Sequence, residues 1–267
     1  GAHLIDPEKA DNRDDFAAEY EEMRRKKGMT KDAAYKAMGD PLFYGAMMVR
    51  RGMVDCSVAG ARNTTGAVLS AALRVIGVKP GCKTVSSCFL MVVPEFMGEQ
   101  DKIFVFGDCA VLPQPNAEQL ADVAISSAET GRKVAGIDPT VAMLSFSTKG
   151  SADHPDTEKV REAVKIAQER APHLKLDGEL QLDAAIIPKV GNSKAPGSDV
   201  AGKANVLIFP DLDAGNIGYK LVQRFTGAEA VGPVIQGLAK PANDLSRGCS
   251  IDDIVNVTAI SILNSAE

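Results

Sequence analysis

Short apolar runs that alternate with amphipathic stretches are the feature that most constrains the fold of this chain. Residues 55–59 read as a buried strand that precedes a helix over 64–76, and residues 141–145 precede a helix over 156–170 in the same way. A third unit places the strongly β-forming run 204–209 before a helix over 217–225. Repeated strand-then-helix units predict an α/β fold, in which a mostly parallel sheet carries helices on both faces.

The segments between these units are predicted from the same patterns. Residues 7–36 are charged and helical in pattern, residues 41–51 form an apolar helix, and residues 116–130 form an amphipathic one. Two β-rich runs, 85–93 and 102–109, resemble a hairpin. A further unit is expected to run from 183–185, through a loop at 191–202, to the β-forming run 204–209.

Length and charge limit the classes of function. A chain of 267 residues suits two domains that share a cleft, and 30 basic against 35 acidic residues give no general attraction to nucleic acid or to an anionic membrane. No apolar run approaches the roughly 20 residues that a membrane helix needs, and the sequence shows no secretory leader. We therefore expect a soluble, cytoplasmic protein whose anionic ligands are met by local clusters.

The cysteines predict neither a disulfide framework nor a structural metal site. The five are Cys56, Cys82, Cys88, Cys109 and Cys249, an odd number with no Cys-x-x-Cys spacing. Reduced thiols are expected, and no metal site is predicted.

Residues 240–255 concentrate anion-binding and acid-base groups ahead of an apolar helix. Ser246 and Arg247 offer a hydroxyl and a planar fork of donors suited to phosphate, and Asp252 and Asp253 fall where a helix exposes free N–H groups. The alternative interpretation is that Ser250 caps the helix, the two aspartates complement its dipole, and Arg247 forms a surface ion pair. On spacing alone the two interpretations carry about equal weight.

Other segments offer weaker candidates for anion binding. Ser145, Ser147, Thr148 and Lys149 follow a predicted strand at the end where α/β sheets bind ligands, against the alternative of a solvated turn. Thr64 begins a predicted helix, where capping is the more common role.

Eight segments of the chain together resemble the phosphate acetyltransferase and phosphate butyryltransferase family. They are DPLFYG (40–45), VAGA (58–61), FGDCA (106–110), PNAEQLA (115–121), VAMLSFST (141–148), KAP (194–196), FPDL (209–212) and NDLSRG (243–248). The likeness covers nearly the whole chain, and its last segment is the most specific.

The resemblance implies a fold of two α/β/α domains with an interdomain cleft, similar to isocitrate and isopropylmalate dehydrogenases. Residues 1–85 with 236–267 would form the first domain and residues 86–235 the second. Family members are homodimers that move an acetyl group between coenzyme A and inorganic phosphate through a ternary complex. Coenzyme A is then a substrate, and no further cofactor is expected.

The resemblance also suggests roles for particular residues. Asp253 would be the base for the coenzyme A thiol, while Arg247 and Ser246 would bind acetyl phosphate and stabilise charge on its oxygens. Arg24, in the basic run that ends at Gly28, matches a substrate-contacting arginine, and Asn243 of the NDLSRG segment is included among the substrate-binding residues.

Two departures from the family pattern stand out. Where members have Leu-Arg-Pro-Ala, this chain reads Leu69-Ser70-Ala71-Ala72, so Arg74, one helical turn later, is the nearest replacement for that arginine. Members also begin with a further strand-helix segment, so the first domain is expected to be truncated at its N-terminus.

Three functions remain open at this point. The first is phosphate acetyltransferase, the second is a butyryl-specific or broader acyltransferase, and the third is a non-catalytic module that senses acetyl-CoA. Ser246, Arg247 and Asp253 together favour an enzyme. Ser70, in place of the family arginine, and the absent N-terminal strand-helix segment are compatible with a sensor.

Overall fold

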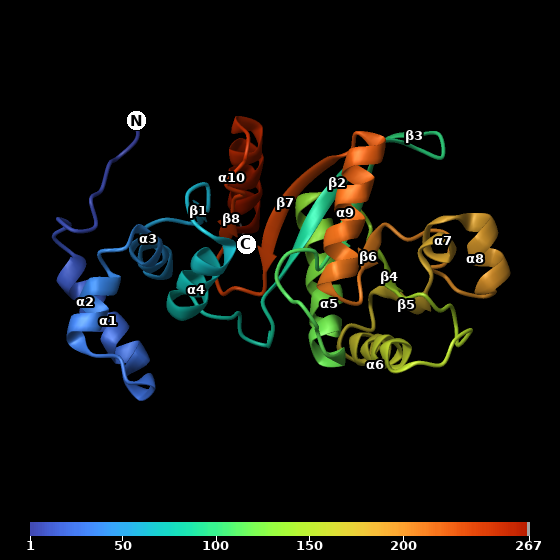
Figure 1. Ribbon diagram of the computed structural model, residues 1–267, viewed down its shortest axis with the longest axis horizontal. Coiled ribbons are helices and arrows are strands. Elements are labelled where there is room, and N and C mark those ends of the chain that lie inside the picture. The colour runs from blue at the N-terminus through green and yellow to red at the C-terminus, as the bar shows by residue number, and fades with distance from the viewer. Residues whose placement is uncertain (266–267) are drawn as a thin grey trace.

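The computed structural model describes residues 1–265, which form two parts side by side along the long axis of the molecule (Figure 1). The first part holds α1 (Arg13–Arg24), the 3-10 helix η1 (Arg25–Lys27), α2 (Lys31–Ala37), α3 (Pro41–Arg50), β1 (Ser57–Ala59), α4 (Thr65–Val75), β8 (Ala242–Asp244) and α10 (Ile251–Ser265). The second part holds β2 (Ser86–Phe96), β3 (Glu99–Gly107), α5 (Ala117–Val134), β4 (Thr140–Leu144), α6 (Pro155–Arg170), β5 (Lys175–Leu180), α7 (Leu182–Ile186), α8 (Pro188–Lys194), β6 (Val206–Ile208), α9 (Leu212–Thr226) and β7 (Glu229–Gln236). The predicted α/β class is confirmed.

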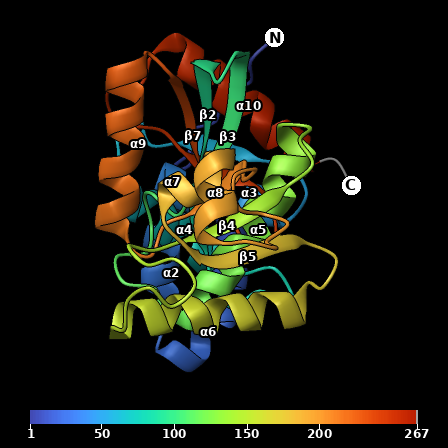
Figure 2. The same cartoon turned by 90° about the vertical axis from the view of Figure 1, so that its right-hand side faces the viewer.

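The second part is built on a six-stranded sheet in the order β5-β4-β6-β3-β2-β7. The pairs β4–β5, β4–β6 and β3–β6 are parallel, as the strand-helix units predicted. Strand β2 pairs antiparallel with both β3 and β7, so the sheet is mixed and the predicted hairpin forms one side of it. Helices α5 and α9 lie on opposite sides of β2, β3 and β7 (Figure 2).

The strands of this sheet are buried on both faces, because successive side chains of a strand point to opposite sides. Val141 and Met143 of β4 belong to the core under α5 and α6, whereas Ala142 and Leu144 belong to the core that includes Phe209. The continuous apolar runs seen in the sequence are the consequence.

The first part has its own core and a two-stranded sheet. Phe16, Tyr20, Met38, Met47 and Val75 are fully or almost fully buried in one cluster of α1 to α4. Strand β1 pairs parallel with β8, residue 57 opposite 242 and residue 59 opposite 244. This pairing joins two segments that are far apart in the sequence, and it sets β8, which contains the first two residues of the NDLSRG segment, beside the start of α4.

Some predicted elements differ from the structure. The segment 183–185, to which the sequence patterns assigned no particular element, lies inside helix α7, because alanine favours a helix and Ala185 N–H donates to Gln181 O at 2.9 Å. The predicted loop 191–202 begins inside helix α8. Residues 7–36 divide into α1, η1 and α2, separated at Gly28, whose φ of 78° suits glycine.

The cysteines and the helices bear on two expectations from composition. All five cysteines are free thiols, as predicted. Within residues 1–265, no helix combines the length and the apolar character that crossing a membrane would require.

Candidate active site

A cleft of about 740 Å³ lies where the two parts meet, and four of the predicted site residues line it. Thr64 comes from the start of α4, Ser246 and Arg247 come from the loop after β8, and Asp253 comes from the first turn of α10. Residues separated by up to 189 positions in sequence therefore meet around one cavity, which is the size that a small-molecule site has.

The loop between β8 and α10 is held by a reciprocal cap. Ser250 Oγ accepts from the Asp253 N–H at 3.1 Å, while Asp253 Oδ2 accepts from the Ser250 N–H at 2.8 Å and from Ser250 Oγ at 2.9 Å. The capping interpretation of Ser250 is thus confirmed, and it does not exclude the other, because the cap itself fixes the Asp253 carboxylate at the cleft.

Arg247 differs from the surface ion-pair partner that the alternative interpretation expected. Its side chain is exposed to the cleft, and it forms no salt bridge with any residue of the part described, 1–265. Nearby, Ser246 Oγ accepts the Gly248 N–H at 3.3 Å, which turns the loop around it. A guanidinium that is unpaired within the described residues is available to an anionic ligand.

The first turn of α4 forms another edge of the cleft. Thr64 Oγ1 accepts the Ala67 N–H at 3.2 Å, so Thr64 caps the helix and also faces the cavity. Arg74 lies in the last turn of the same helix, is exposed, and does not line this cleft. The structure therefore places Arg74 and Thr64 at opposite ends of α4.

The opposite wall of the cleft comes from residues that the sequence patterns did not single out. Phe89 of β2 and Tyr219 of α9 stack with ring centroids 4.3 Å apart and planes at 15°, and both line the cleft. Lys220 and Arg224 of α9 line it as well. Burial raises the pKa of the Tyr219 hydroxyl above its ordinary value. The only sequence signal for this wall was the amphipathic pattern of the helix itself.

Two further predicted residues lie away from this cavity. Asn243 is buried in β8, where Oδ1 accepts the Ile235 N–H at 2.7 Å and Nδ2 donates to Ser261 Oγ at 2.8 Å. Arg24 ends α1 and does not line the cleft, and its buried Nε has no hydrogen-bond partner within residues 1–265. The structure gives Asn243 a packing role between β7 and α10.

The residues predicted as a second anion site surround a buried glutamate. Ser147 Oγ donates to Glu179 Oε1 at 2.8 Å, and Lys149 forms an ion pair with Asp177. Thr148 Oγ1 accepts the Gln181 N–H at 2.9 Å, and Ser145 Oγ accepts the Ser147 N–H at 3.2 Å. None of the four lines the cleft with Arg247, and their polar atoms already serve the loop after β4.

Replacing Glu179 with alanine is expected to lower the free energy of unfolding by about 3 kcal/mol. Glu179 is 1% exposed and also accepts the Gly150 N–H at 2.8 Å, with Arg161 Nη1 at 3.5 Å. Its loss deprives the buried Ser147 hydroxyl, the Gly150 N–H and the Arg161 guanidinium of this acceptor. Urea unfolding should show this loss beside a much smaller one for Asp153→Ala, whose side chain is 93% exposed and 3.7 Å from the same arginine. Equal losses would contradict a structural role for Glu179.

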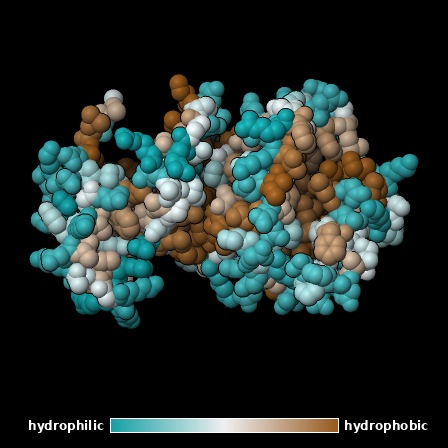
Figure 3. Space-filling view, in the orientation of Figure 1, coloured by the Kyte–Doolittle hydropathy of each residue, from teal (hydrophilic) through white to brown (hydrophobic). Residues whose placement is uncertain are grey.

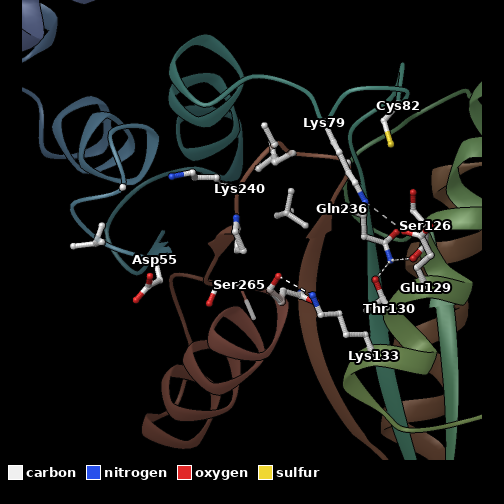
Figure 4. A pocket seen from close by; sticks show the side chains of 18 residues that line it. Asp55, Lys79, Cys82, Ser126, Glu129, Thr130, Lys133, Gln236, Lys240 and Ser265 are labelled. Atoms are coloured by element: carbon white, nitrogen blue, oxygen red, sulfur yellow. Dashed lines mark hydrogen bonds and ion pairs between the residues drawn. The ribbon is translucent and has the colours of Figure 1, made fainter. Parts of the chain in front are cut away.

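A second cavity, of about 540 Å³, lies between α5, α10 and the segments that flank β7 (Figure 4). Its lysines are engaged, since Lys133 Nζ donates to Asn264 O at 3.1 Å and Lys240 Nζ donates to Val49 O at 3.0 Å. Gln236, which also lines it, donates to Thr130 Oγ1 at 2.8 Å. None of the predicted site residues lines this cavity, so the cleft with Arg247 is the candidate active site.

Comparison with known proteins identifies the family of the chain. Residues 1–262 match the family described as "Phosphate acetyl/butaryl transferase". The phosphate acetyltransferase of Acetivibrio thermocellus is 52% identical over 265 residues, which cover 99% of this chain and 80% of the relative. That of Treponema pallidum is 52% identical over 266 residues, covering 98% of this chain and 79% of the relative. A phosphotransacetylase structure from Streptococcus pyogenes superposes with a TM-score of 0.92 at 44% identity, covering 97% of this chain and 77% of that one. This chain belongs to the phosphate acetyl/butyryl transferase family of acyltransferases.

Proposed function

We propose that the cleft transfers an acetyl group between coenzyme A and inorganic phosphate, which is phosphate acetyltransferase activity. The observation that carries the proposal is that the Arg247 guanidinium, which has no ion-pair partner within residues 1–265, lies in the same cavity as the Asp253 carboxylate. A cation for phosphate and a carboxylate for the thiol proton are the two groups that this reaction needs.

In the direction that forms acetyl-CoA, Asp253 takes the proton of the coenzyme A thiol. The thiolate then attacks the carbonyl carbon of acetyl phosphate, and the carbonyl oxygen gains negative charge. The bond from that carbon to the phosphate oxygen breaks, and inorganic phosphate leaves. Arg247 binds the phosphate throughout, and the Ser246 hydroxyl donates a hydrogen bond to the developing oxyanion. Both substrates occupy the cleft together, so no covalent enzyme intermediate forms.

The assignment is tested by measuring phosphate-dependent consumption of acetyl-CoA by the purified chain, with propionyl-CoA and butyryl-CoA in parallel. Acetyl-CoA should give the highest kcat/KM. Faster turnover of butyryl-CoA would instead assign a butyryltransferase. Binding of coenzyme A without any turnover would instead indicate the non-catalytic module that senses acetyl-CoA. We propose that neither a metal nor a further cofactor takes part, so turnover should survive a chelator.

We propose that the wider arrangement follows the same family pattern. We propose that residues 1–85 with 236–267 and residues 86–235 act as two domains around the cleft, in the manner of isocitrate and isopropylmalate dehydrogenases. The chain is proposed to act in the cytoplasm, where coenzyme A and acetyl phosphate are its small-molecule partners. Nucleic acid and membranes play no part in this proposal.

A homodimer is proposed through the exposed apolar stripe of α9. Ile217, Leu221 and Phe225 recur every four residues and are 57%, 47% and 83% exposed, and Figure 3 shows hydrophobic side chains gathered along this helix. Sedimentation equilibrium should give twice the chain mass, and Phe225→Asp should shift it toward the monomer. A wild-type monomer at micromolar concentration would contradict the proposal.

A further inference from the structure

Asp244 is a buried carboxylate at the cleft that the proposed chemistry does not use. It ends β8, two residues before Ser246, and its side chain is only 1% exposed. It nevertheless belongs to the lining of the cleft. A carboxylate so placed is costly unless its oxygens are bonded or the charge serves another purpose.

The two oxygens of Asp244 have different surroundings. Oδ2 accepts the hydroxyl of Thr65, the first residue of α4, at 2.6 Å. Oδ1 is buried and has no hydrogen-bond partner among residues 1–265. Burial raises the pKa of the Asp244 carboxyl above its ordinary value. The hydrogen bond to Thr65 is therefore the one side-chain hydrogen bond that stabilises the Asp244 carboxylate within residues 1–265.

The Asp244 side chain packs against the backbone of Gly60, where a residue with a side chain would not fit. Gly60, at a φ of +120°, lies so close that an added Cβ would be 2.3 Å from Asp244 Oδ1 and 2.4 Å from the Leu245 carbonyl oxygen. The chain that follows β1 is thus pressed against the chain that follows β8. These two segments lead to the start of α4 and to Ser246 and Arg247.

The hydrogen bond between Asp244 and Thr65 connects two segments that each offer groups for binding an anion. Thr64 caps the 11-residue helix α4, which Thr65 begins. The first N–H groups of this helix lack intrahelical partners, and its dipole favours negative charge. Arg247 lines the same cleft, three residues beyond Asp244. A single phosphate can contact both the N-terminus of α4 and Arg247 only if the distance between them is fixed.

We propose that Asp244 is a positioning residue, which holds the first turn of α4 in register with Ser246 and Arg247 so that both engage the same phosphate. The inference rests on the proposed phosphate acetyltransferase function and deepens it. Asp244 does not itself contact the reacting atoms. Its partner Thr65 transmits the constraint.

The test compares steady-state constants for four variants. Thr65→Val and Asp244→Ala should each raise the KM for phosphate by about tenfold, the worth of one lost positioning hydrogen bond, while the KM for acetyl-CoA changes by less than about twofold. Thr65→Ser keeps the hydroxyl donor, and Asp244→Asn keeps an acceptor oxygen. Both conservative variants should stay close to the wild-type KM for phosphate.

Ser261→Ala is the matched control, because Ser261 bonds Asn243 on the other side of β8. It should lower the melting temperature and leave the KM for phosphate unchanged. An unchanged KM in Thr65→Val, or an equal rise in Ser261→Ala, would overturn the proposal. Thr65→Val decides the matter even if Asp244→Ala does not fold.

A second measurement separates this inference from the proposed reaction. Inorganic phosphate alone should raise the melting temperature of the wild-type chain and raise it much less in Thr65→Val. If the wild type shows no turnover, the reaction is wrong, and the phosphate-dependent shift still tests the role of Asp244. Equal shifts in the two proteins would overturn that role.

Discussion

Arg247→Ala is expected to lower kcat/KM for phosphate-dependent consumption of acetyl-CoA by about 100- to 1000-fold. The guanidinium has no ion-pair partner within residues 1–265, so its removal leaves no protein charge unpaired. The loss of activity therefore reflects lost contacts to the ligand. Negative charge builds on the carbonyl oxygen and the phosphate during transfer. Losing the fork should therefore reduce kcat as well as raise the KM for phosphate.

A lysine at the same position separates charge from geometry. Arg247→Lys keeps a positive charge but loses the planar, two-pronged donor set, so it should recover only part of the lost activity. Arg132→Ala, at an exposed position in the last turn of α5, is the control and should match the wild type. Full activity in Arg247→Lys would mean that charge alone suffices. Full activity in Arg247→Ala would contradict the proposed site.

The strands and helices of the second part were largely predictable, because burial on both faces leaves apolar runs that the sequence displays. β4, β6, α6 and α9 all lie within or close to the predicted segments. β5 was missed because its sequence, KLDGEL, mixes charged residues and a glycine at the edge of the sheet. β7 was missed because it contains Gly232-Pro233, a pair that usually breaks a strand.

The site residues that follow one another in a loop could be predicted from the sequence. Those whose side-chain direction depends on the geometry of a strand were harder to predict. In β8, alternation turns Asn243 toward Ser261 and its neighbour Asp244 toward Thr65. A three-residue strand is too short to reveal that alternation in the sequence. The stacked Phe89 and Tyr219 come from elements 130 positions apart, and their meeting depends on how β2 and α9 pack.

Asp253→Asn is expected to lower kcat by about 100- to 10,000-fold in the direction that forms acetyl-CoA, with little change in either KM. The asparagine oxygen can still accept from the Ser250 N–H and hydroxyl, so the cap that starts α10 is kept. What the variant loses is the ability to take a proton. A fall in kcat with an unchanged melting temperature would therefore point to the base and not to the helix.

Asp252→Asn supplies the matched control, because Asp252 lies in the same first turn and carries the same charge but does not line the cleft. If the aspartates act only through the helix dipole, both variants should behave alike and differ little from the wild type. If Asp253 removes the thiol proton, only its replacement should slow the reaction. Wild-type kcat in Asp253→Asn would show that another group accepts the proton, and the assignment of Asp253 as the base would be wrong.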